Sequence, residues 1–222
     1  MAKKAILAGA SGLVGRELLR LLLESSDYAA VHSLVRRVTP DTPKSPKLSE
    51  QLVDFERLPA LAACDDVYVA LGTTIKVAGS PEAFRKVDHD YVVAVARAGR
   101  AAGAERLAVV SALGADPMSR VFYNRVKGEM QEAVAALGYG SVVIVQPSLL
   151  LGDREALGQA KRAGEVWARR LLEPVAGLIP SGFRPVRASD VAAVLVSAML
   201  TAAPGTRIIA SRELHGSSGR VS

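Results

Sequence analysis

Three polar side chains with the chemistry to move a proton stand near the middle of the chain. Tyr123 and Lys127 lie four residues apart in a segment predicted to be helical, so they share one helix face. A nearby ammonium favours the phenolate and makes a tyrosine usable as an acid or base near neutral pH. Ser111 ends a predicted strand twelve residues before Tyr123. Its hydroxyl is suited to hold a substrate carbonyl oxygen while Tyr123 delivers a proton.

A second set of residues has the spacing of a phosphate-binding loop. Gly9, Gly12 and Gly15 lie between the first predicted strand and the first predicted helix. Glycines at such positions let the backbone turn tightly, approach a pyrophosphate and pack the helix on the strand, while the helix N-terminus supplies free N–H groups to the phosphates. We therefore expect a bound dinucleotide, with Ser11 and Leu13 of the same loop among its contacts.

Both sets need elements that place them at one edge of a sheet. Short apolar runs predict strands, and 3.6-residue periodicity predicts helices between them. The expected strands are 5–8, 31–35, 51–54, 66–71, 107–110, 142–145 and 207–210, and the expected helices are 16–23, 80–102, 121–137, 156–172 and 189–200. This alternation predicts an α/β fold with a doubly wound, mostly parallel sheet, in which ligands bind at the carboxyl ends of the strands.

The domain organisation is predicted to be simple. No linker divides the chain, so we expect one domain over residues 1–222, with a small C-terminal substrate lobe at roughly 148–206 and a loose polar tail at 211–222. Ser80 and Pro81 are typical of a helix start. The helix at 189–200 is expected to be capped by Ser189 or Asp190.

The end of the second predicted strand indicates which dinucleotide binds. An unphosphorylated adenosine ribose is recognised by an acidic residue about 20 residues past the loop. That region holds Arg36 and Arg37 and no acid, and arginines attract a 2′-phosphate. We therefore expect NADP(H) as the cofactor. Asp54, after the third strand, is placed to contact the adenine edge.

Composition excludes several other classes of protein. Of 222 residues, half are apolar and 23% are charged, so we expect a folded chain rather than a disordered one, and the net charge of +6 comes from scattered basic residues. Aromatic residues make up only 5%, too few for a base-stacking surface. Cys64 stands alone, and His32, His89 and His215 lack metal-ligand spacing. We expect no nucleic-acid or membrane partner, no metal site, and a cytoplasmic location.

Five further motifs indicate which family of dinucleotide-binding proteins the chain resembles. Beside the glycine loop and the Ser111, Tyr123 and Lys127 set, these are 70–74 (ALGTT), 78–80 (AGS), 84–88 (FRKVD), 111–116 (SALGAD) and 147–152 (PSLLLG). Together they resemble the atypical branch of the short-chain dehydrogenase/reductase superfamily that contains the human Tat-interacting oxidoreductase and its bacterial relatives. The resemblance covers roughly residues 4–200.

The resemblance implies a fold and a site. It implies a Rossmann-like fold, NADP(H) binding, and Ser111, Tyr123 and Lys127 in the catalytic positions, with Lys127 also binding the nicotinamide ribose hydroxyls. The expected cofactor-binding set is completed by four residues at strand ends, Leu71, Gly72, Thr73 and Pro147.

Three positions depart from the pattern of this branch. Many relatives have a second serine where this chain has Ala112, and many have arginine where it has Gln146. Asp88 stands where related enzymes often carry an asparagine near the active site, and a solvated helix carboxylate is an equally good interpretation of it.

The sequence thus predicts an NADP-dependent oxidoreductase of the short-chain type that transfers hydride between nicotinamide and a carbonyl or alcohol substrate. A sugar-nucleotide epimerase or dehydratase is one alternative, and an NADPH-binding sensor or interaction protein with little turnover is another. The expected partner is a small molecule, and a homodimer is compatible with the sequence. Arg154, Arg184 and Arg187 follow the sixth strand, where an anionic substrate would be bound.

Overall fold

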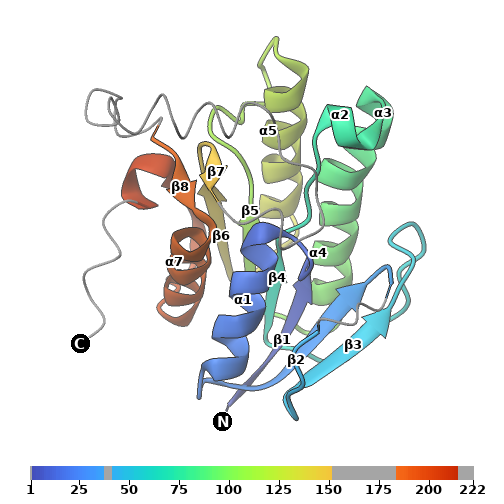
Figure 1. The fold of residues 1–222 in the computed structure, drawn as a ribbon, viewed down its shortest axis with the longest axis vertical. Coiled ribbons are helices and arrows are strands. Elements are labelled where there is room, and N and C mark those ends of the chain that lie inside the picture. The colour runs from blue at the N-terminus through green and yellow to red at the C-terminus, as the bar shows by residue number, and fades with distance from the viewer. Residues whose placement is uncertain (1, 38–41, 152–183, 215–222) are drawn as a thin grey trace.

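A seven-stranded parallel sheet forms the centre of the protein (Figure 1). The structure is a computed structural model that describes residues 2–37, 42–151 and 184–214. The strands of the main sheet are β1 (Lys3–Ala8), β2 (Tyr28–Val35), β3 (Leu48–Leu52), β4 (Asp66–Val69), β5 (Arg106–Val110), β6 (Ser141–Gln146) and β9 (Gly205–Ala210). The order across the sheet is β3-β2-β1-β4-β5-β6-β9, and every neighbouring pair is parallel. The predicted doubly wound Rossmann-like α/β fold is confirmed.

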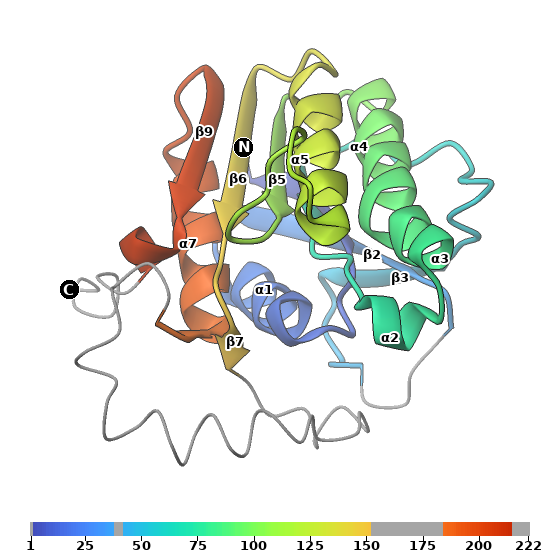
Figure 2. The ribbon, with the colours of Figure 1, turned by 90° about the horizontal axis from the view of Figure 1, so that it is seen from above.

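Helices cover both faces of this sheet (Figure 2). They are α1 (Leu13–Glu24), α2 (Ile75–Ala78), α3 (Pro81–Arg85), the π-helix η1 (Lys86–Asp90), α4 (Tyr91–Ala101), α5 (Phe122–Ala135) and α7 (Ala188–Leu200). Helices α1 and α7 lie on one face, and α4 and α5 lie on the other. The strands between them are covered on both faces, which explains why β4 is buried at every residue and why its sequence has no polar alternation.

Strand order reverses between β1 and β4. The chain leaves β1 to form β2 and β3 on one side, and then returns to place β4 on the other side. In open parallel sheets the ligand crevice forms at this switch point, outside the carboxyl ends of the strands. The glycine loop follows β1, and residues 70–74 follow β4, so the fold brings two predicted cofactor-binding segments to the same place.

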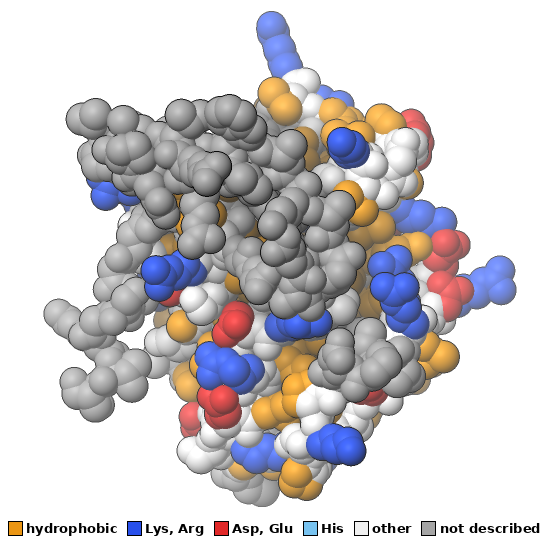
Figure 3. Space-filling model, viewed as in Figure 1, with side chains coloured by type: hydrophobic (Ala, Val, Ile, Leu, Met, Phe, Trp, Pro, Cys, Tyr) orange, Lys and Arg blue, Asp and Glu red, His pale blue; other side chains and the backbone are white. Residues whose placement is uncertain are grey.

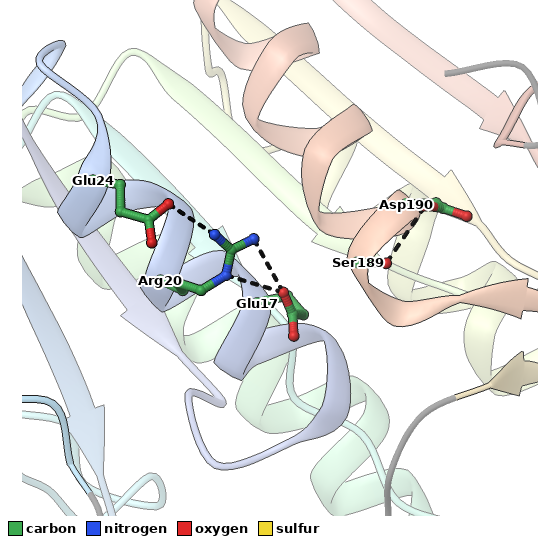
Figure 4. Close-up of polar contacts among 5 residues, drawn as sticks. All are labelled: Glu17, Arg20, Glu24, Ser189 and Asp190. Atoms are coloured by element: carbon green, nitrogen blue, oxygen red, sulfur yellow. Dashed lines mark hydrogen bonds and ion pairs between the residues drawn. The ribbon is translucent and has the colours of Figure 1, made fainter. Parts of the chain in front are cut away.

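Helices α1 and α7 pack against each other over the sheet. Leu18 and Leu22 of α1 and Val191 and Leu195 of α7 share one buried core. The outer side of α1 carries an ion-pair ladder in which Arg20 reaches Glu24 at 2.7 Å and Glu17 at 3.3 Å (Figure 4). Because these side chains are largely exposed, the ladder adds only about 0.3–0.5 kcal/mol per pair.

The amino ends of the strands are joined by a buried polar cluster. The Tyr28 hydroxyl donates to Asp66 at 2.5 Å and lies 2.7 Å from the Tyr68 hydroxyl, and Arg106 Nε donates to Asp66 at 2.6 Å. Burial raises the pKa of both phenols well above the ordinary tyrosine value, so both stay protonated. The cluster ties β2, β4 and β5 together at the edge opposite the ligand crevice.

Several elements differ from the sequence predictions. The third strand begins at Leu48 rather than residue 51, and α2 and the short parallel pair β7 (Leu150–Leu151) and β8 (Val186–Arg187) were not predicted. The expected cap of α7 is wrong: the N-cap residue is Arg187, without a side-chain cap, while the Ser189 hydroxyl bonds Asp190 at 3.4 Å (Figure 4).

The C-terminal segment is only partly described. The expected loose tail is wrong for residues 211–214, which form a 3₁₀ turn with Leu214 fully buried in the core shared by α1 and α7. The predicted helix 156–172 and much of the predicted lobe 148–206 lie outside the described residues. The single-domain organisation and the lobe stay predictions.

The described residues bear on the sequence expectations about surface charge, membrane-spanning helices and metal sites. On the face in Figure 3, Lys and Arg side chains are separated by acidic and hydrophobic ones. No described helix is long and apolar enough to cross a membrane. Within the described ranges no three His, Cys, Asp or Glu side chains are grouped to hold a metal ion.

Candidate functional site

The glycine loop folds as a tight turn in which two positions, Gly9 and Gly15, have no room for a side chain. Gly9 has φ of 97°, and a Cβ there would lie 2.6 Å from the Ala70 backbone of the neighbouring strand end. A Cβ at Gly15 would lie only 1.9 Å from the Gly9 carbonyl oxygen. Gly12 N–H donates to that same oxygen at 3.0 Å and closes the turn. Gly9 and Gly15 are therefore required by the backbone itself, whereas a Cβ at Gly12 would make only an ordinary 3.4 Å contact with the Gly9 oxygen.

The turn ends at the N-terminus of α1, which carries no local group to neutralise it. Gly12 is the N-cap residue, so no side chain caps the helix, and the first turn contains no acidic residue. Ser11 is exposed and Leu13 is half-buried beside it. The partial positive charge and the N–H groups of the first turn suit a phosphate.

The residues predicted to contact the adenosine half lie beyond β2 and β3. Arg36 and Arg37 directly follow β2 and are both exposed. Asp54 is exposed after β3, and its carboxylate accepts a hydrogen bond from the Glu56 backbone N–H at 2.9 Å. The two arginines carry the positive charge at the end of β2, and Asp54 shapes the loop that follows β3.

A buried ion pair lies at the centre of the candidate site. Lys127 Nζ lies 2.8 Å from Asp88 Oδ1, and the two side chains are only 4% and 1% exposed. The second oxygen, Asp88 Oδ2, accepts a hydrogen bond from the Thr73 backbone N–H at 2.8 Å. The interpretation of Asp88 as a solvated helix carboxylate is therefore wrong. Asp88 joins the segment after β4 to the helix that carries Lys127.

A π-helical turn lies where Asp88 is buried. The predicted helix 80–102 is three consecutive elements, α3, η1 and α4, and the middle one is a π-helix that contains Asp88. The start at Ser80 is confirmed: its hydroxyl accepts from Ala83 N–H at 3.1 Å, and Pro81 is the first helical residue. A π turn inserts one extra residue and rotates the following side chains, and such turns are frequent at functional sites.

Tyr123 stands one helical turn before Lys127, at the start of α5. Its ring packs against Phe84 of α3, with ring centroids 5.2 Å apart and an interplanar angle of 34°. Phe84 is fully buried, so it gives the Tyr123 ring a fixed support. An ion pair between Arg85 and Glu129 also joins α3 to α5. The sequence prediction that Tyr123 and Lys127 share a helix face is consistent with this helix.

Ser111 follows β5 at the carboxyl edge, and its hydroxyl is held by a residue that we did not predict. Its backbone N–H donates to Val145 O of β6 at 2.8 Å, which extends the ladder past the end of β5. Its Oγ, in a side chain only 6% exposed, accepts a hydrogen bond from Gln131 Nε2 at 2.6 Å. Gln131 Oε1 in turn accepts from Gln146 Nε2 at 3.2 Å.

Gln131 extends the stripe of polar residues on α5. It lies four residues after Lys127, as Lys127 lies four after Tyr123, so the spacing itself was a signal for this residue. The segment leading into α5 is held close by Gly128, where a Cβ would lie 2.2 Å from the backbone of Asp116 and Pro117.

The other predicted residues lie at strand ends. Leu71 and Gly72 follow β4, and a Cβ at Gly72 would lie 3.4 Å from Asp88 Oδ1. Pro147 follows β6, is buried, and accepts from the Leu113 N–H at 2.9 Å. Ala112 is buried next to Ser111.

The three arginines proposed to bind an anionic substrate are only partly placed. Arg154 lies outside the described residues, and Arg187 is exposed directly before α7. The backbone oxygen of Arg184 accepts a hydrogen bond from the Ser148 hydroxyl. Anion binding by this group stays a prediction.

Comparison with known sequences identifies the family. A family model described as NAD(P)H-binding matches residues 9–165. The chain belongs to this family. It is 35% identical over 210 residues to the protein fmp52, mitochondrial, of Aspergillus clavatus, covering 90% of this chain and 88% of the relative. It is 33% identical over 186 residues to HTATIP2 of Rattus norvegicus, covering 82% and 75%. The family resemblance drawn from the motifs is confirmed.

The names of these relatives correct one expectation. The fmp52 proteins of Aspergillus clavatus and Eremothecium gossypii, the latter 37% identical over 154 residues and covering 68% of each chain, are both named mitochondrial. The expected cytoplasmic location is therefore wrong, because these names point to mitochondria.

Solved structures with the same fold include proteins in complex with nucleotide sugars. MoeE5 in complex with UDP-glucose and NAD has a TM-score of 0.68 at 17% identity, covering 95% of this chain and 79% of that chain. The UDP-N-acetylglucosamine 4-epimerase of Methanobrevibacter ruminantium M1 has a TM-score of 0.69 at 12% identity, covering 94% and 76%. At these identities the likeness concerns the fold alone.

Proposed function

We propose that this protein is an NADP(H)-dependent oxidoreductase of the short-chain type, acting on a carbonyl or alcohol substrate. The observation that carries the proposal is the buried Lys127. It lies on α5 one turn after Tyr123, and Asp88 of η1 holds its ammonium in place. Burying an ammonium until its side chain is only 4% exposed costs free energy. A catalytic role for the positive charge explains why the fold keeps it there.

Each residue has a defined task in this proposal. The nicotinamide supplies or accepts the hydride when bound. The Ser111 hydroxyl donates a hydrogen bond to the substrate oxygen, and Tyr123 Oη gives that oxygen a proton. The Lys127 ammonium stabilises the negative charge that Tyr123 acquires. Asp88 keeps the ammonium in place through its 2.8 Å contact, and Thr73 N–H keeps Asp88 in place.

The preference for NADP(H) over NAD(H) is the finer part of the proposal. It is supported by exposed Arg36 and Arg37 at the end of β2, where recognition of an unphosphorylated ribose needs an acid. A guanidinium binds a 2′-phosphate through paired, charge-assisted hydrogen bonds. The family match supports NAD(P)H binding without separating the two cofactors.

The epimerase alternative has one specific observation in its favour. The compared nucleotide-sugar enzymes share this fold over nearly all of the chain. The same comparisons cover only 76–79% of those longer chains, so this protein has less sequence available for a sugar-nucleotide pocket. We therefore rank the epimerase below the oxidoreductase.

The test is turnover of NADPH on a panel of aldehydes and ketones, followed by the cofactor's absorbance. We expect Tyr123→Phe to lower turnover by about 10²- to 10⁴-fold, because it removes the proton donor, and to leave NADPH affinity nearly unchanged. Tyr139→Phe is the matched control, since the Tyr139 hydroxyl donates to the Ala96 carbonyl at 2.5 Å and takes no part in the proposed reaction. Wild-type turnover in Tyr123→Phe would refute the assignment. Tight NADPH binding without turnover on any substrate would favour the sensor.

A further inference from the structure

One buried side chain beside the site has no task in the mechanism above. Gln131 is 8% exposed, and both ends of its amide are engaged, with Nε2 on Ser111 Oγ at 2.6 Å and Oε1 on Gln146 Nε2 at 3.2 Å. If Gln131 only filled space on the inner face of the helix, an apolar side chain of the same size would serve equally well there. The two hydrogen bonds instead give its amide a fixed direction.

The direction of the amide decides what the serine can do. Because Gln131 donates to Ser111 Oγ, the hydroxyl hydrogen is not used in that contact and is free to point elsewhere. A serine that is to donate to a substrate oxygen needs that hydrogen. If the amide were reversed, its oxygen would accept the hydroxyl hydrogen, and Ser111 would present only lone pairs to the substrate.

Gln146 contacts the other end of the Gln131 amide. Its Nε2 donates to Gln131 Oε1, which leaves Nε2 of Gln131 to face Ser111. The three side chains therefore form a line of donors running from Gln146 to Gln131 to Ser111. Gln131 and Gln146 also line a groove of about 410 Å³ bordered by α5, β6 and β9.

We propose that Gln131 is a positioning residue that orients the Ser111 hydroxyl as a hydrogen-bond donor, and that Gln146 fixes the direction of the Gln131 amide. This inference rests on the proposed function, because it concerns the donor role of Ser111 in that reaction. It extends the functional stripe on α5 by one helical turn, from Tyr123 and Lys127 to Gln131.

Two substitutions at Gln131 separate direction from packing. Gln131→Met keeps length and volume but donates nothing, and we expect kcat to fall roughly 3- to 10-fold, the value of one hydrogen bond. Gln131→Glu offers only acceptors, so it captures the Ser111 hydrogen, and we expect a larger fall of roughly 10- to 100-fold. Affinity for NADPH is expected to stay unchanged in both. Glu132→Gln is the control, since it makes the opposite exchange one residue away on the exposed side.

Gln146→Glu tests the line of donors without touching either Gln131 or Ser111. A carboxylate at 146 accepts from the Gln131 amide nitrogen, which turns the amide oxygen toward Ser111. We expect kcat to fall at least as far as in Gln131→Met. In a Gln131→Met background the same change at 146 has no amide to reverse, and its effect should disappear.

A double-mutant cycle with Ser111→Ala decides the outcome. If Gln131 acts through Ser111, then Gln131→Glu lowers kcat in the wild type but not in Ser111→Ala. Equal effects of Met and Glu at 131, or a full additional loss in Ser111→Ala, would overturn the inference and leave the proposed function intact. Unchanged turnover in Ser111→Ala itself would refute the role of Ser111, and with it both proposals.

Discussion

Removal of the Asp88 carboxylate should destabilise the protein because it leaves the Lys127 ammonium without its partner. The pair is separated by 2.8 Å, and the two side chains are 1% and 4% exposed, so the ammonium stays buried when the carboxylate is lost. Breaking a buried pair by removing one partner costs about 3–5 kcal/mol. For a chain of this size, 1 kcal/mol shifts the melting temperature by about 2–4 °C, so Asp88→Ala should melt about 6–20 °C below the wild type.

The double variant distinguishes charge from packing. Asp88→Ala with Lys127→Met has no buried charge, and we expect it to be more stable than the sum of the single effects by about 1–3 kcal/mol. Asp88→Asn keeps one acceptor oxygen, which can serve either the Thr73 N–H or the ammonium but not both, so its loss should be smaller than that of Ala and still measurable.

Urea unfolding of the cofactor-free protein measures these effects, with the slope of the transition checked for constancy across the variants. Because this assay needs no substrate, it is independent of the proposed reaction. A loss below about 1 kcal/mol in Asp88→Ala, or strict additivity in the double variant, would show that an unpaired Lys127 ammonium is tolerated in the fold.

Two further predictions concern the cofactor and the thiol. Arg36→Ala combined with Arg37→Ala should weaken NADPH binding by about 10- to 150-fold and leave NADH binding nearly unchanged, measured by calorimetry at one salt concentration; a preference for NADPH that survives both substitutions would place the phosphate elsewhere. Burial raises the pKa of the Cys64 thiol to about 11, so the thiolate becomes abundant only as the pH rises toward that value. Thiol reagents at neutral pH should therefore label Cys64 rapidly only after unfolding, and fast labelling of the native protein would contradict its burial.

The parts of the fold that the sequence predicted are those with a local cause. Continuous apolar runs identified the strands, because a parallel sheet covered on both faces needs apolar residues on both sides. The Ser80 cap and the glycine loop could be predicted because their causes are local. The Ser80 hydroxyl caps an N–H three residues later, and a backbone φ of 97° at Gly9 favours glycine.

The parts that the sequence did not predict depend on distant partners. Asp88 is buried within a π turn that no 3.6-residue pattern describes, and its partners Lys127 and Thr73 come from other elements. Gln131 is an ordinary helix residue by type, and only the approach of β5 and β6 gives its amide two partners. The cap of α7 failed because Ser189 and Asp190 already lie inside the helix.

The contact between α1 and α7 has a consequence for how the protein matures during synthesis. The apolar side of α1, with Leu18 and Leu22, is completed by Val191 and Leu195 from near the opposite end of the sequence. While the chain is being translated, that side of α1 stays uncovered until more than 180 residues have emerged. The glycine loop leads into α1, so the helix that carries the dinucleotide cradle gains its full packing only after α7 has been made. A ribosome-stalled or truncated chain lacking α7 would expose the hydrophobic leucine side of α1, which chaperones can bind.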